Sequence, residues 1–231
     1  DEVLIETEKL NVYVAPARGG RIFEMDIRAF DFNLLNGLGR RPEPYHEKIR
    51  AYRPPVEGAE APVSIHDAVK MKEAGLGDLL VYDWHPREML VDHFVPRDTA
   101  LDDFRANRVR ELGDFINRDY VATPTKTGVR LVCDDFIFDG GEKNAARVSK
   151  TIAVGDALEV EYEIANLSAR ELAFVFAPEM NFSMLGGNAP DRYFRFDGKR
   201  DAPDHLAVAR DARARSIELV DEYDGFIVRV A

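Results

Sequence analysis

Two histidines stand beside aromatic residues, each in a predicted loop or short helix, a combination that could contact a sugar or a neighbouring protein domain. His46 follows Tyr45, and His93 comes shortly after Tyr82 and Trp84. Aromatic faces can pack on the apolar faces of sugar rings, and an imidazole both donates and accepts hydrogen bonds. The alternative is that each histidine only holds its loop by hydrogen bonds, while the rings form small satellite cores.

Charged and polar residues extend this set of candidates. Arg40 and Arg41 form a basic pair that is either solvated or clamps an acidic surface of a neighbouring domain. Glu179 and Asn181 stand at the end of a predicted strand, where they either line a concave face or complete the hydrogen bonds of the strand end. The full set of candidates for a carbohydrate or interdomain contact is Arg40, Arg41, Tyr45, His46, His66, Tyr82 and His93.

No sequence pattern marks a catalytic or metal centre. The chain has no HExxH motif, no Cys/His ligand spacing, no GxSxG and no glycine-rich phosphate loop. A glycosidase needs two carboxyl groups beside the scissile bond, one protonated and one ionised. Carboxylates are abundant, but nothing in the sequence marks such a pair. We therefore predict no catalytic residue, no metal ligand and no cofactor.

The charge balance argues against two classes of partner. The 231 residues include 42 acidic and 31 basic side chains, which gives a net charge of −11. Nucleic acids and anionic membranes bind basic faces, so we expect neither as a partner. No apolar run approaches the ~20 residues that span a bilayer. The single cysteine, Cys133, cannot form an internal disulfide, and we expect a buried thiol in a reducing, cytoplasmic setting.

A strand and a long loop organise the first part of the chain. Phe23, Met25 and Ile27 alternate with charged residues, which is the period of a half-buried strand. The stretch from there to Lys48 follows neither the strand nor the helix period, and we predict an ordered irregular loop. Capping residues and stop signals predict short helices over residues 64–74, 83–94 and 99–107.

From Gly113 onward the chain is predicted to be almost entirely β. The clearest strand alternates Leu158, Val160, Tyr162 and Ile164 with three glutamates, which predicts one core face and one solvent face. Roughly a dozen short strands with turns between them imply a mainly β fold, a large antiparallel β-sandwich with a few short helices in residues 64–107. All-β chains of this length commonly form one unit, so we predict a single domain over residues 1–231.

Several motifs follow one another along the chain in a recognisable order. The longest are a GG-x-[IL]-x-E-[LM]-D strand, F-N-L-L-N and R-R-P-E-x-Y-H, here at residues 19–26, 32–36 and 40–46. Shorter ones stand at residues 63–67, 82–84, 92–94, 113–115 and 177–187. Together they resemble the C-terminal region of the α-amylase/4-α-glucanotransferase enzymes of glycoside hydrolase family 57.

The resemblance carries expectations about fold and function. It implies a β-sandwich similar to the supersandwich of galactose mutarotases. In this family the nucleophile and the acid/base belong to an N-terminal (β/α) barrel, and this chain is similar only to the region after it. The resemblance thus implies a non-catalytic domain, excised from the C-terminal part of a longer enzyme, that supports the barrel. The barrel of the same enzyme is then its partner, and α-glucan is a second candidate partner.

Two other functions stay open. One is a free-standing sugar-active enzyme, such as a mutarotase-like epimerase that uses a histidine and a carboxylate as acid and base. The other is a purely structural module without sugar contact. Under the leading hypothesis, we expect residues 40–46, the predicted helix at 64–74 and the segment 82–94 to share one side of the sandwich, and that side to face the barrel.

Overall fold

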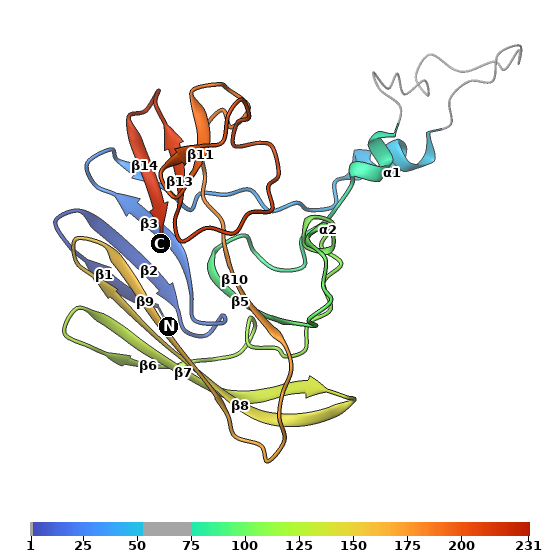
Figure 1. Ribbon diagram of the computed structural model, residues 1–231, viewed down its shortest axis with the longest axis vertical. Coiled ribbons are helices and arrows are strands. Elements are labelled where there is room, and N and C mark those ends of the chain that lie inside the picture. The colour runs from blue at the N-terminus through green and yellow to red at the C-terminus, as the bar shows by residue number, and fades with distance from the viewer. Residues whose placement is uncertain (1, 53–74) are drawn as a thin grey trace, which may run out of the picture.

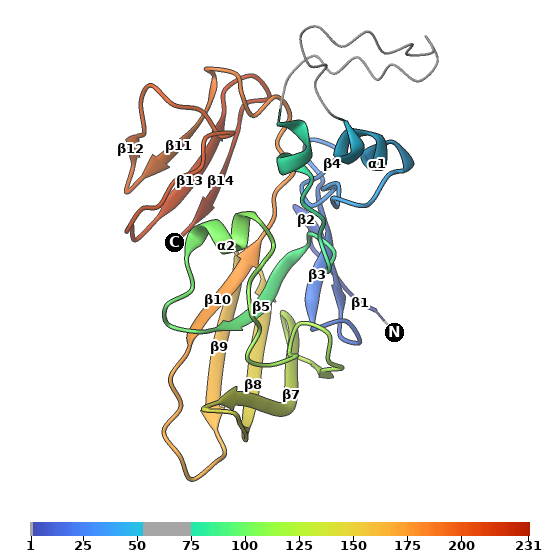
Figure 2. The same cartoon turned by 90° about the vertical axis from the view of Figure 1, so that its right-hand side faces the viewer.

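The computed structural model describes residues 2–52 and 75–231 and consists mainly of antiparallel β-strands (Figure 1, Figure 2). The mainly β fold class predicted from the sequence is confirmed. The predicted helix over residues 64–74 and the candidate residue His66 lie outside the described residues.

The largest sheet has six strands, in the order β1-β2-β3-β5-β10 with β4 paired to β3. The strands are β1 (Val3–Glu6), β2 (Leu10–Ala15), β3 (Arg21–Ile27), β4 (Phe32–Asn33), β5 (Met89–Val95) and β10 (Val175–Met180). β3 meets β5 through the pair Ile22 and Met89. This sheet therefore brings the first strands of the chain next to strands from its middle and its last third.

The second sheet has four strands in sequence order, β6-β7-β8-β9. They are β6 (Val121–Pro124), β7 (Gly128–Asp139), β8 (Glu142–Val154) and β9 (Leu158–Asn166). The alternation predicted for β9 is confirmed, because its three glutamates are exposed while the apolar residues between them pack against the core. Neighbouring positions of a strand point to opposite faces, so a strand at the edge of the sandwich shows this period clearly.

A third sheet is formed by the C-terminal strands in the order β12-β11-β13-β14. They are β11 (Arg192–Phe196), β12 (Lys199–Arg200), β13 (Ile217–Asp221) and β14 (Phe226–Val230). The sheet lies beside the end of β3, above the other two sheets in the view of Figure 1. Phe226 of β14 packs against the segment after β3: its ring centroid lies 5.8 Å from that of Phe30 and 5.9 Å from that of Phe32.

The hydrophobic core lies between the first two sheets. Buried residues of β2, β3 and β5 face buried residues of β7 and β8 in one cluster. Phe94 of β5 is central, since its ring centroid lies 4.9 Å from that of Phe115 and 5.2 Å from those of Phe174 and Phe176. Two antiparallel sheets that share one core form a sandwich, as the sequence predicted.

The stretch predicted as an irregular loop contains a helix, α1 (Pro44–Ala51), which also lies outside the 64–107 range predicted for helices. Pro44 stands in the first turn, where its missing N–H costs nothing. The backbone N–H of Glu43 donates to Nδ1 of His46 over 3.1 Å and closes the helix start. No residue of α1 is buried, so the helix has no apolar stripe from which its period could be read.

The predicted helix over residues 83–94 is wrong, because this segment ends in strand β5. All seven residues of β5 are buried, so the strand shows no alternation of polar and apolar residues.

Besides α1, the described helices are a 3-10 turn, η1 (Leu76–Leu79), and α2 (Leu101–Arg105). The second of these confirms the short helix predicted within residues 99–107. None of the described helices has the length and apolarity that crossing a membrane requires.

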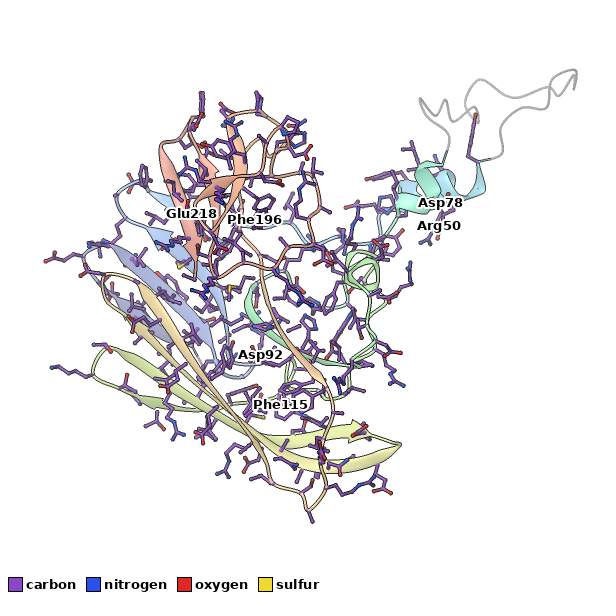
Figure 3. The ribbon with its side chains drawn as sticks, in the orientation of Figure 1. Arg50, Asp78, Asp92, Phe115, Phe196 and Glu218 are labelled. Carbon is purple, nitrogen blue, oxygen red and sulfur yellow. The ribbon has the colours of Figure 1, made fainter. Side chains whose placement is uncertain are left out.

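A buried ion pair joins the two sheets of the sandwich. Nζ of Lys150, on β8, donates to Oδ2 of Asp92, on β5, over 2.6 Å, and both side chains are fully buried. The hydroxyl of Tyr162 donates to the other oxygen of Asp92 over 2.7 Å. Burial lowers the pKa of Lys150, and the Asp92 carboxylate opposes that shift. Figure 3 shows Asp92 in the interior of the molecule.

Backbone carbonyls complete the shell of this ammonium group. Lys150 also donates to the carbonyl oxygens of Gly19, over 2.9 Å, and Leu90, over 3.2 Å. Gly19 has φ +71°, and a Cβ there would stand 2.3 Å from the carbonyl oxygen of Ile116. Only glycine fits this close approach, and the Gly19–Gly20 motif thus places one acceptor of the buried lysine.

We predict that Lys150→Met lowers the free energy of unfolding by about 3–5 kcal/mol, because it leaves the Asp92 carboxylate buried without its cation. Urea unfolding followed by tryptophan fluorescence measures this. The control is Lys9→Met, which removes an exposed ion pair with Asp156 and should leave the unfolding midpoint unchanged. Equal midpoints for the two variants would contradict a structural role of the buried pair.

Candidate functional site

A cleft of about 420 Å³ lies beside β5 and β10, on the face of β5 opposite to the one that carries the core residue Phe94. β5 and β10 contribute His93 and Glu179, and α2 with the residues after it forms one wall. The opposite wall is the segment before β5, which includes Asp83, Trp84 and His85. Trp84 is 47% exposed.

His93 forms the floor of the cleft and touches a carboxylate with each ring nitrogen. Its Nδ1 lies 2.6 Å from Oε1 of Glu111, and its Nε2 lies 3.0 Å from Oε2 of Glu179. Only 2% of the histidine side chain is exposed. A buried ring between two carboxylates is held in one orientation, because both of its polar atoms are bonded.

Sheet register explains the contact between His93 and Glu179. His93 of β5 pairs with Ala177 of β10, so Glu179 stands two residues further along β10 and on the same face. Oε1 of Glu179 accepts from the amide of Asn181 over 2.7 Å. Oε2 of Glu111 accepts from the backbone N–H of Phe94 over 3.2 Å, which anchors the second carboxylate to β5.

The carboxylates of Glu111 and Glu179 determine the protonation state of His93. Burial by itself lowers the pKa of His93, but the hydrogen bonds to Glu111 and Glu179 outweigh it and raise the pKa to about 9. Burial raises the pKa of Glu179, yet its hydrogen bonds with His93 and Asn181 outweigh this and hold the pKa below its ordinary value. Without a bound ion, His93 is thus an imidazolium at neutral pH.

A second histidine stands beside this pair. Nε2 of His85 lies 3.7 Å from Oε2 of Glu179, and its Nδ1 lies 3.1 Å from the carbonyl oxygen of Pro86. His85 is buried, and the ring of Trp84 meets it edge-on at 4.9 Å. Ligand atoms of His85, His93 and Glu179 all lie within 4.8 Å of one another. The sequence patterns mark none of these three as a metal ligand.

Asp83 ties two arginines to the rim of the cleft. Nε of Arg40 donates to Oδ1 over 2.9 Å, and Nε of Arg87 donates to Oδ2 over 2.8 Å. The backbone N–H of Arg40 also donates to Oδ2 over 2.7 Å. Burial raises the pKa of Asp83, but the hydrogen bonds from Arg87 and Arg40 outweigh it and hold the pKa well below its usual range.

His46 and Tyr82 meet next to this rim. The Tyr82 hydroxyl lies 3.2 Å from Nδ1 of His46, and the two rings stack with centroids 5.6 Å apart. The Tyr82 carbonyl oxygen accepts from the amide of Asn107 over 2.6 Å, which links the segment to the end of α2. The start of α1, the segment before β5 and α2 are thus connected through side-chain contacts.

The structure brings together some of the residues predicted from the sequence and separates others. Arg40, His46 and Tyr82 lie together around residues 82–83. Arg41 and Tyr45 are exposed beside them, at the start of α1. His93 instead lies in the floor of the cleft.

Sequence reasoning missed the roles of Asp83, His85 and Glu111. Their partners are distant in sequence, since 43 residues separate Asp83 from Arg40 and 18 separate Glu111 from His93. The only available signal for the first two was their position in and next to the Tyr82–Trp84 motif. Of the two residues that the sequence placed at a strand end or on a concave face, Glu179 lines the cleft, and Asn181, just after β10, donates a hydrogen bond to it.

Comparison with protein families matches all 231 residues to the family described as "Alpha-amylase/4-alpha-glucanotransferase, C-terminal". A 4-alpha-glucanotransferase of Thermococcus kodakarensis is 36% identical over 185 residues, which cover 80% of this chain and 27% of that protein. Alpha-amylase 1 of Dictyoglomus thermophilum is 31% identical over 198 residues, covering 84% of this chain and 28% of that protein.

A solved structure gives the same result for the fold. The 4-alpha-glucanotransferase of Thermococcus litoralis superimposes with a TM-score of 0.73 and 26% sequence identity, covering 99% of this chain and 31% of that chain. The chain therefore spans little more than a quarter of the curated relatives that it matches, and the matched region is C-terminal.

The charge of His93 predicts how stability depends on pH. Its pKa is about 9 in the folded chain against 6.5 for a free histidine, so its contribution is complete below pH 6.5 and is lost as the pH rises through 9. We expect the wild type to lose on the order of 3 kcal/mol of unfolding free energy over this window relative to His93→Gln. Urea titrations at several pH values in metal-free buffer measure it. A wild type and a variant with parallel pH profiles would contradict the assignment.

Proposed function

Because this chain belongs to the C-terminal family of alpha-amylases and 4-alpha-glucanotransferases, we propose that it is a non-catalytic β-sandwich domain of an α-glucan hydrolase or transferase of glycoside hydrolase family 57. It supports the catalytic barrel of the same enzyme in carbohydrate metabolism. Its share of about a quarter of its relatives' length supports this, because most of each relative, including its N-terminal part, has no counterpart here.

The state of the carboxylates in the cleft is the observation that carries the non-catalytic role. Glycoside hydrolysis needs one carboxyl group that is protonated near neutral pH. Among the described residues, the carboxylates that line the cleft are Asp83 and Glu179, and cationic partners lower the pKa of both. Neither is suited to be the general acid, since the hydrogen bonds from Arg87 and Arg40 to Asp83, and from His93 and Asn181 to Glu179, favour the ionised carboxylate.

The side that carries α1 is the proposed contact with the catalytic barrel. Three large apolar or aromatic side chains in and next to α1 and η1 are exposed, namely Leu38, Tyr45 and Leu79, with Leu38 exposed to 90%. Apolar groups left in water on one side of a domain mark an interaction surface. Arg41 beside them supplies a charge for an acidic partner surface, and α1 projects away from the sheets (Figure 1).

We further propose that Trp84 contacts α-glucan from the mouth of the cleft. Its half-exposed side chain offers an apolar face on which a sugar ring packs.

A mutarotase-like enzyme is less well supported, because both ring nitrogens of His93 contact carboxylates and only 2% of its side chain is exposed. A sugar in the cleft cannot take a proton from this histidine without breaking a buried ion pair.

We expect the pure 231-residue chain to release no reducing sugar from amylose and to transfer no glucan between maltooligosaccharides. Reducing-end assays and chromatography of the products measure this, with the Thermococcus litoralis enzyme as positive control. Activity that rises in proportion to the amount of chain, and that disappears with Glu179→Gln, would contradict the non-catalytic role.

In the intact enzyme, we expect Arg41→Ala and His46→Ala each to weaken the contact between the domains by about 1 kcal/mol. Thermal unfolding should then show two separated transitions or a lower first transition, with reduced activity. The matched control is Arg213→Ala, an exposed arginine in the loop before β13. If all three variants behave alike, the side that carries α1 does not face the barrel.

A further inference from the structure

The face of β5 that lines the cleft gathers two imidazoles and one carboxylate from three separate segments. His93 comes from β5, Glu179 from β10, and His85 from the segment before β5. Among the described residues they are the one such group whose ligand atoms all lie within 4.8 Å of one another. Two histidines and one carboxylate form a common ligand set for zinc and similar divalent transition-metal ions.

Both histidines already have the second partner that a metal-binding imidazole uses. Nδ1 of His93 lies 2.6 Å from a Glu111 oxygen, and Nδ1 of His85 lies 3.1 Å from the Pro86 carbonyl oxygen. An imidazole that binds a metal through one nitrogen typically donates its other N–H to a carboxylate or a backbone carbonyl, which fixes the tautomer. The Nε2 atoms of both rings are the ones that face Glu179.

The carboxylate is held in the same way. Oε1 of Glu179 accepts from the Asn181 amide over 2.7 Å, and that amide also donates to the carbonyl oxygen of Glu88 over 2.9 Å. Oε2 therefore points at both histidines while Oε1 is fixed from behind. The three ligands are oriented by neighbours that do not themselves enter the site.

The spacing fits a small tetrahedral ion. Zinc bonds of about 2.0–2.2 Å at tetrahedral angles place neighbouring ligand atoms roughly 3.4 Å apart. The observed distances from Oε2 of Glu179 are 3.0 Å to Nε2 of His93 and 3.7 Å to Nε2 of His85, on either side of that value. The two positive charges of the ion balance the carboxylates of Glu179 and Glu111. A bound ion takes the place of the proton between Nε2 of His93 and Oε2 of Glu179.

We propose that His85, His93 and Glu179 bind one zinc ion, or a divalent transition-metal ion of the same preference, with the fourth position open to the cleft. The site connects β5, β10 and the segment before β5, so a bound ion holds the wall that carries Trp84 against the strands. Such a metal site needs only these side chains and their partners, whatever the role of the chain within a larger enzyme.

Calorimetric titration of zinc chloride into the tag-free, chelator-treated chain at pH 8 tests the proposal. We expect one ion per chain with micromolar or tighter affinity, and a melting temperature that rises with zinc concentration. His85→Ala and Glu179→Gln should each weaken binding at least tenfold. Glu111→Gln removes only the outer partner of His93 and should weaken it by about 10–100-fold. His205→Ala, outside the cluster, is the control and should bind as the wild type does.

A measurement on the wild type alone guards against variants that do not fold. Crystals soaked in zinc and measured on both sides of the zinc absorption edge should show one anomalous peak between His85, His93 and Glu179. No calorimetric binding with no peak would overturn the proposal and leave an ion-pair network only. Binding that is equally strong in Glu179→Gln and the wild type, or a peak only at other histidines, would overturn it as well.

Discussion

The structure depends on one buried ion pair, in which the Lys150 ammonium meets the Asp92 carboxylate between the two sheets of the sandwich. An unpaired charge at this depth is very unfavourable, so the two sheets can pack only in the register that brings these groups together. The carbonyl oxygens of Gly19 and Leu90 and the hydroxyl of Tyr162 complete the network. The early glycine turn is thereby connected to both sheets.

The same constraint sets the geometry of the cleft. Asp92 and His93 are neighbours on β5 and therefore point to opposite faces of the strand. With Asp92 directed into the core, His93 is directed into the cleft, where the register of β10 presents Glu179 to it. A change in the pairing of the sheets would move the histidine away from both of its carboxylates. Core packing and the geometry of the candidate site therefore depend on the same strand, since opposite faces of β5 carry Asp92 and His93.

Charges in the cleft are used to hold segments together, and this is the physical basis of the proposed supporting role. Asp83 connects Arg40, which precedes α1, to Arg87, which precedes β5. Glu179 connects β10 to β5 through His93. Groups so paired keep their ionised forms and connect the segments of the cleft wall, while the exposed Leu38, Tyr45 and Leu79 lie in and next to α1 and η1. A wall connected in this way, together with exposed apolar residues, suits a domain that positions another domain.

Local patterns in the sequence determined the strands, and several motifs together indicated the family. The alternation in β9 survives because one face of that strand meets solvent, and such a period can be read from neighbouring residues alone. In β5 both faces are buried, so no period remains and a helix was predicted there. In α1 no residue is buried, and Pro44 was the main local signal. The contact of His93 with Glu179 joins residues 86 positions apart. Only the pairing of β5 with β10 brings them together, because a sequence pattern records neighbours along the chain and not neighbours across a sheet.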